Sequence, residues 1–75
     1  MKPLYLEGAR PTRVVLDGPS LGVSVEGEAD RRYPLGRLSR VLAGGDLWWE
    51  TGALAACLER GIPVTFLRRG GSAAG

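Results

Sequence analysis

The chain has 75 residues, so it forms at most one domain, and a domain of this size buries only about 60% of the surface that its unfolded form exposes. One cysteine and no histidine exclude an intrachain disulfide and leave too few nitrogen and sulfur ligands for a structural zinc site. Ten basic and eight acidic residues give a formal charge of +2, which permits contact with nucleic acid but does not require it. We therefore expect a partner to stabilise so small a chain.

The two ends of the chain give expectations about its location and organisation. The N-terminus has a charge and then a very short apolar run, which is unlike a signal peptide, and no stretch reaches the ~18 apolar residues of a membrane span. With the lone thiol, this predicts a cytoplasmic protein without membrane contacts. Residues 70–75 are only Gly, Ser and Ala, a composition typical of a flexible linker. We expect one β domain over residues 1–69 and a further domain after the linker.

The first third of the chain predicts strands. Residues 4–6 form a short apolar run that Pro3 and Pro11 bracket, and residues 12–17 form a β-branched run. Over residues 21–26, apolar side chains alternate with small or polar ones, as in a half-buried strand.

Turn sequences, Gly18-Pro19-Ser20 and residues 27–30, follow these two strands, and residues 31–35 are again extended. Residues 12–35 are therefore expected to form a three-stranded antiparallel meander.

A different pattern follows the meander. Residues 38–43 predict a strand with Leu38 and either Val41 or Leu42 facing inward, and Gly44-Gly45-Asp46 is expected to break it. Leu47-Trp48-Trp49 is a short apolar segment after this break.

Residues 51–60 predict the single helix. Thr51 is a candidate N-cap, Leu54, Cys57 and Leu58 share one face, and Gly61 ends the helix. Residues 62–67 predict a last strand, parallel to residues 38–43. The expected fold class is α+β and mainly β, with two small sheets: the antiparallel meander and the strand-helix-strand unit.

Catalytic groups are scarce. Without histidine the usual general base is missing, and no serine or threonine has a credible partner that would activate it. Cys57 lies on the expected buried face of the helix, where a free cysteine behaves as a small hydrophobe. The sequence therefore predicts a non-catalytic chain without a metal or cofactor of its own.

Two groups of residues are candidates for contacts. Adjacent residues of a strand face opposite ways, so one of Trp48 and Trp49 fills the core and the other needs a different surface. We favour a protein interface for the exposed one over base stacking, because stacking platforms usually combine several aromatic residues with cations. The candidate nucleic-acid contacts are Arg31, Arg32, Arg37 and Arg40, although cations grouped in this way more often form a solvated rim than a DNA-binding surface.

Two stretches carry a resemblance to a known family. Residues 33–42, Tyr-Pro-Leu-Gly-Arg-Leu-Ser-Arg-Val-Leu, and residues 51–67, which end in Leu-Glu-Arg-Gly-Ile-Pro-Val-Thr-Phe-Leu, are similar to the N-terminal β domain of the CRISPR-associated spacer integrase, the first-numbered CRISPR-associated protein. The resemblance covers roughly residues 4–69. Trp48-Trp49 departs from it, since a less bulky strand is usual there.

This resemblance implies a role without chemistry for the chain. In the family, a metal-dependent endonuclease and integrase centre of Glu, His and Asp lies in a helical C-terminal domain, and none of those positions exists in these 75 residues. The N-terminal domain is then expected to support a homodimer, to position double-stranded DNA during spacer acquisition, and to work beside the second CRISPR-associated protein. The alternative is a free-standing small β-barrel that binds RNA or DNA through its arginines.

Overall fold

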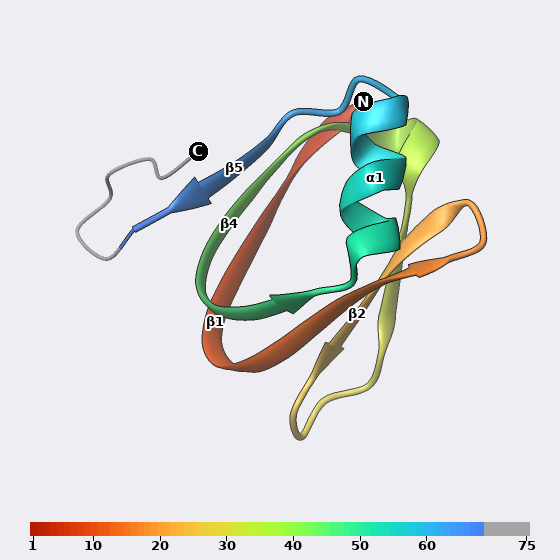
Figure 1. Ribbon diagram of the computed structural model, residues 1–75. Coiled ribbons are helices and arrows are strands. Elements are labelled where there is room, and N and C mark those ends of the chain that lie inside the picture. Colours follow the sequence, from red (N-terminus) through yellow and green to blue (C-terminus); the bar gives the residue numbers. More distant parts are fainter. Residues whose placement is uncertain (69–75) are drawn as a thin grey trace.

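One sheet of five strands runs through the computed structural model, which describes residues 1–68 (Figure 1). Its strands are β1 (Lys2–Asp17), β2 (Ser20–Val25), β3 (Arg31–Pro34), β4 (Leu38–Trp49) and β5 (Val64–Leu67), in the order β3-β2-β1-β4-β5. A 3-10 turn, η1 (Leu35–Arg37), joins β3 to β4, and the helix α1 (Thr51–Glu59) joins β4 to β5. The predicted linker, residues 70–75, lies outside the described residues.

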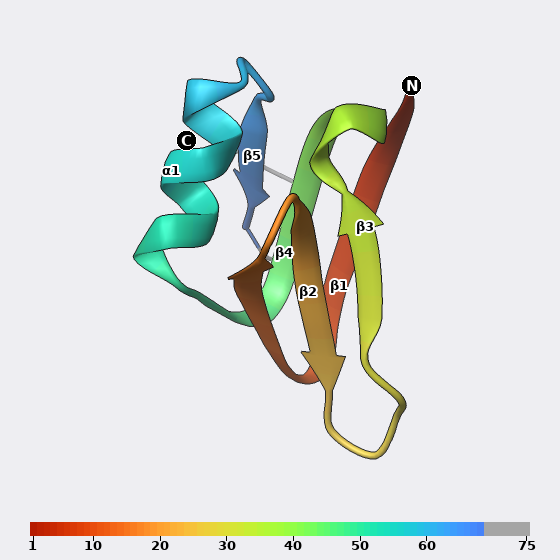
Figure 2. The same ribbon diagram turned by 90° about the vertical axis from the view of Figure 1, so that its right-hand side faces the viewer.

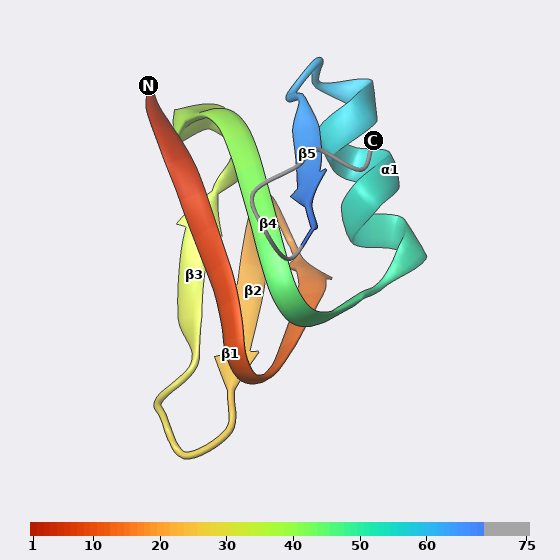
Figure 3. The same cartoon turned by 90° about the vertical axis from the view of Figure 1, so that its left-hand side faces the viewer.

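The two longest strands, β1 and β4, run parallel and belong to both halves of the sheet. Residues 2–8 of β1 pair with residues 38–45 of β4, whereas residues 12–14 pair with residues 47–49, and the register shifts in between. Both strands bend at this shift (Figures 2 and 3). The early halves of β1 and β4 form a first layer with β5, and their late halves form a second layer with β2 and β3.

Glycines make the bend possible. Gly8 and Gly45 are paired across β1 and β4, and the two backbones approach closely there. A Cβ atom on Gly8 would lie 2.6 Å from the backbone oxygen of Asp46, and Gly45 has a φ of 81°, which disfavours any residue with a Cβ. The strands can therefore turn from one layer into the other without ending.

The expectation of two small sheets is wrong for this reason. The meander and the strand-helix-strand unit both exist, but β1 and β4 continue through the bend and join them into one mixed sheet. Pro3 and Pro11 do not bracket a short strand, since both lie inside β1, and Gly44-Gly45-Asp46 bends β4 instead of breaking it.

The pairings inside each unit are confirmed. The late half of β1 pairs antiparallel with β2, and β2 pairs antiparallel with β3, as the meander predicted. In the first layer β4 and β5 are parallel, with Val41 opposite Val64. Leu38 and Val41, rather than Leu42, face inward.

The core lies between the two layers, and α1 closes one side of it. Ala53 and Cys57, one helical turn apart, are fully buried. Leu58 was expected on this face but is 73% exposed, because the position after Cys57 lies about 100° further around the helix. Thr51 is the first helical residue and Glu50 occupies the N-cap position, so the expected cap is also one residue off. Gly61 ends the helix with a φ of 68°, as predicted.

Candidate functional site

Acidic and thiol side chains are dispersed over the part of the chain that the structure describes. Residues 1–68 include no group of three or more His, Cys, Asp or Glu side chains that could hold a metal ion. The metal that the family resemblance implies therefore does not fit this part of the chain. Within the same residues, no helix is long and apolar enough to cross a membrane.

Cys57 is a core residue, as predicted. Its side chain is completely inaccessible, and burial raises the pKa of its thiol above the ordinary 9.0, because the buried thiolate loses its hydration. We expect a thiol reagent to react with Cys57 in the native protein more than about 100-fold more slowly than in the unfolded chain, since reaction requires opening of the core.

The raised pKa of Cys57 also sets a pH dependence. The folded state holds the thiol proton more tightly than the unfolded state does. The buried thiol therefore contributes fully to the free energy of unfolding below pH 9.0, and this contribution is lost as the pH rises through the folded-state pKa. Urea unfolding from pH 7 to 10.5 should show this decline. A Cys57→Ala variant that declines equally would contradict the assignment.

Trp48 is the exposed member of the tryptophan pair. It lies on the outer face of the second layer with 55% of its surface exposed, opposite Arg13 of β1. The guanidinium of Arg13 lies 5.0 Å from the centroid of the Trp48 ring, a cation–π contact that holds the ring in place. The pair forms a fixed aromatic projection, which is typical of an interface anchor.

Trp49 points the opposite way and packs against the core. Its ring meets Phe66 of β5 edge to face, with centroids 5.8 Å apart. The indole Nε1 is buried and has no hydrogen-bond acceptor within residues 1–68. Trp49 therefore ties the late half of β4 to β5.

The four candidate arginines are all exposed but do not form one patch. Arg31 and Arg32 are neighbours in β3, so their side chains leave opposite faces of the strand. Arg32 pairs with Asp17, with 2.9 Å between Nε and Oδ2. Arg37 lies in η1 and Arg40 on the outer face of β4, in the first layer. The structure distributes these cations over both faces of β3, over η1 and over the outer face of β4.

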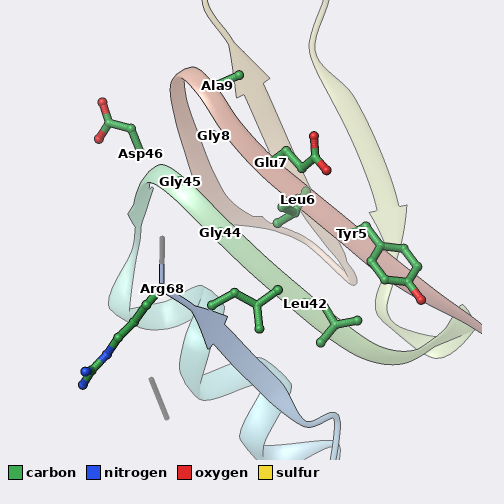
Figure 4. A pocket seen from close by; sticks show the side chains of 11 residues that line it. Tyr5, Leu6, Glu7, Gly8, Ala9, Leu42, Gly44, Gly45, Asp46 and Arg68 are labelled. Carbon is green, nitrogen blue, oxygen red and sulfur yellow. The ribbon is translucent and has the colours of Figure 1, made fainter. Parts of the chain in front are cut away.

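An open groove crosses the outer face of the first layer (Figure 4). Its floor is the glycine-rich bend, and its walls combine apolar side chains with both signs of charge: Tyr5, Glu7, Leu42, Asp46, Leu67 and Arg68. Tyr5 is 66% exposed, and Arg40 lies on the same face two residues before Leu42. The groove is open, and its side chains are mixed in polarity and charge.

Sequence reasoning missed Tyr5 and Arg13 as surface residues. Tyr5 lies between the buried Leu4 and Leu6, and this alternation was a usable signal that the flanking prolines obscured. Arg13 could not be found from the sequence, because its contact with Trp48 depends on the long-range register of β1 and β4.

Fold and surface together define a small β domain with exposed aromatic and basic side chains. A sequence profile of the family described as CRISPR associated protein Cas1 matches residues 5–75. The chain therefore belongs to the CRISPR associated protein Cas1 family. Comparison with curated protein sequences gives no significant match.

Solved structures agree on the fold. A CAS1 protein from Thermotoga maritima matches 97% of this chain with a TM-score of 0.80 and 15% identity, over 24% of its own length. The structure of a TtCas1–DNA complex matches 95% of the chain, with a TM-score of 0.79 and 20% identity, over 24% of its length. A partial Cas6-RT-Cas1–Cas2 complex matches 96%, with a TM-score of 0.82 and 22% identity, over 22% of its length. The chain thus spans less than a quarter of each of these proteins.

Proposed function

We propose that this chain is the N-terminal β domain of a CRISPR-associated DNA integrase and acts without chemistry of its own, supporting a homodimer and positioning DNA in spacer acquisition. The observation that carries the proposal is the coverage: nearly the whole chain superposes on less than a quarter of the Cas1 structures. In this proposal a divalent metal and the catalytic Glu, His and Asp belong to a helical domain outside these 75 residues.

Trp48 supplies the dimer contact in this proposal. Its ring is large, exposed and held by Arg13, and a fixed aromatic side chain loses little conformational entropy when a partner covers it. Trp49 has no such role, because it is already packed on Phe66.

The outer face of the first layer supplies the DNA contact. Arg40 and Tyr5 share that face, and Arg40 has no ion pair within residues 1–68, so its charge is available to phosphates. Arg37 is likewise exposed and free of ion pairs there. Two of the structures that the chain resembles are described as a DNA complex and as an assembly with Cas2, which supports DNA and a second CRISPR-associated protein as partners.

Light scattering of the purified chain tests the dimer. We expect a particle of twice the 8.0 kDa chain mass at high concentration, and Trp48→Ala should weaken association at least about 30-fold, the effect of losing a hot-spot residue. Leu58→Ala is the matched control, since Leu58 is also exposed but lies on α1. A wild-type chain that stays monomeric would refute the dimer.

A salt titration of binding to a DNA duplex separates this proposal from a free-standing nucleic-acid-binding barrel. We expect weak binding by the isolated chain, reduced further by an Arg37→Glu/Arg40→Glu double substitution but hardly by Arg32→Ala, because Arg32 is paired with Asp17. Tight binding that weakens steeply with salt would favour the barrel. The dispersed arginines speak against that alternative.

A further inference from the structure

The side of the domain opposite α1 is open. Figures 2 and 3 show α1 on one side of the two layers, with β3 and the early half of β1 along the other. We call the space between residues 2–8 of β1 and β3 the seam. No element of residues 1–68 covers the seam in the way that α1 covers the other side.

Both borders of the seam are unpaired strand edges. Residues 2–8 of β1 pair only with β4, and β3 pairs only with β2, within the described part of the chain. Each strand therefore directs a row of backbone N–H and C=O groups away from its partner and towards solvent. Such edges accept an additional strand.

Two recesses follow one another along the seam. The first has a volume of ≈ 320 Å³ and a mixed lining, in which Leu6, Val23 and Val25 lie beside polar and charged side chains. The second, of ≈ 440 Å³, is lined by Leu4, Leu38 and Pro34. Tyr33 lines both recesses, so they adjoin each other at this residue.

The rim of the seam is basic. Lys2, Arg31 and Arg37 line the recesses, are exposed and have no ion pair among residues 1–68, whereas the acids of the rim are Glu7 and a Glu28 that pairs with Arg10 at 3.9 Å. A second copy paired edge to edge would bring the arginines of β3 against their own counterparts. The charge therefore favours an acidic occupant over another copy of this chain.

We propose that the seam binds an extended, acidic peptide segment of a protein partner, which adds a strand to the early half of β1. Alternate side chains of the peptide enter the two recesses, and its carboxylates meet Lys2, Arg31 and Arg37. This site lies apart from Trp48, but Tyr5, Glu7 and Arg37 belong both to its lining and to the surface proposed for DNA, so an occupant of the seam would compete with DNA there. It goes beyond the function proposed above, because it adds a protein partner of stated chemistry.

An NMR titration of the ¹⁵N-labelled chain tests the site. The probe is a synthetic seven-residue peptide of alternating glutamate and valine with blocked ends. We expect the amide signals of residues 2–8 and 31–34 to shift with saturable binding. A peptide with lysine in place of glutamate should bind at least about tenfold more weakly, as three rim charges of modest strength predict.

Two controls separate strand addition from non-specific electrostatic attraction. A probe with N-methyl groups on alternate residues, which cannot donate along one edge, should lose binding. Arg31→Glu/Arg37→Glu should reverse the preference between the acidic and basic peptides, whereas Arg40→Glu, on the outer face of the first layer, should leave it unchanged.

The proposal is overturned by absent shifts at millimolar peptide, by equal affinity for both peptides, or by a DNA duplex that shifts the seam amides in place of the peptide. None of these outcomes bears on the dimer, because Trp48 lies outside the seam.

Discussion

Replacing Gly8 by alanine is expected to destabilise the domain by about 3 kcal/mol or more, and so to lower its Tm by more than about 12 °C. The new Cβ would lie 2.6 Å from the backbone oxygen of Asp46, and no side chain can move to relieve a clash with backbone. The bend would have to open, which disrupts the pairing of β1 with β4 on both of its sides. Thermal unfolding followed by circular dichroism measures the effect.

Gly44→Ala is the matched control for Gly8→Ala. Gly44 lies in the same glycine run, but a Cβ there would lie 3.7 Å from the Cβ of Leu67, an ordinary contact. We expect a change within about 1 kcal/mol. Equal losses in the two variants would show that the close approach of Gly8 and Asp46 is not what constrains the bend.

Trp49→Ala should cost about 2–4 kcal/mol of stability, whereas Trp48→Ala should cost less than about 1 kcal/mol. Trp49 loses its contact with Phe66 and leaves a void in the core that joins β4 to β5. Trp48 loses only its exposed contact with Arg13. Urea unfolding of both variants, followed by far-ultraviolet circular dichroism, compares adjacent residues with the same side chain.

The test depends on which of the two tryptophan substitutions reduces stability more. If Trp48→Ala were the more destabilising change, Trp48 would be part of the folded core, and its proposed role as a contact residue would fail. Phe66→Leu gives a further check, because it removes the edge-to-face partner of Trp49 and should reduce stability without changing Trp48.

Local sequence patterns predicted the elements that depend on neighbours along the chain. The alternation of Leu21, Val23 and Val25 predicted β2 and its buried face, and the Gly61 stop predicted the end of α1. The parallel pairing of β4 and β5 followed from the helix between them. These features are set by periods and turns that a short window contains.

The single sheet could not be predicted in this way. Proline and glycine normally interrupt strands, and only the pairing of Gly8 with Gly45 shows that here they permit a bend. The candidate contact residues could not be predicted from local sequence either. The pattern established that one tryptophan is exposed, but the choice of Trp48 depends on Phe66 and Arg13, which are distant in sequence.

The parallel pairing of β1 with β4 has a consequence for the synthesis of this protein. The first strand to leave the ribosome can form a hairpin with β2 at once, but Leu4 must wait for Val41, and Val14 for Trp49. Until then, half of β1 is an unpaired apolar strand in the nascent chain. Parallel, non-local pairings of this kind form slowly, in milliseconds to seconds. We therefore expect this layer to fold only after Trp49 has left the ribosome, and nascent chains stalled before that residue to be the most prone to aggregation.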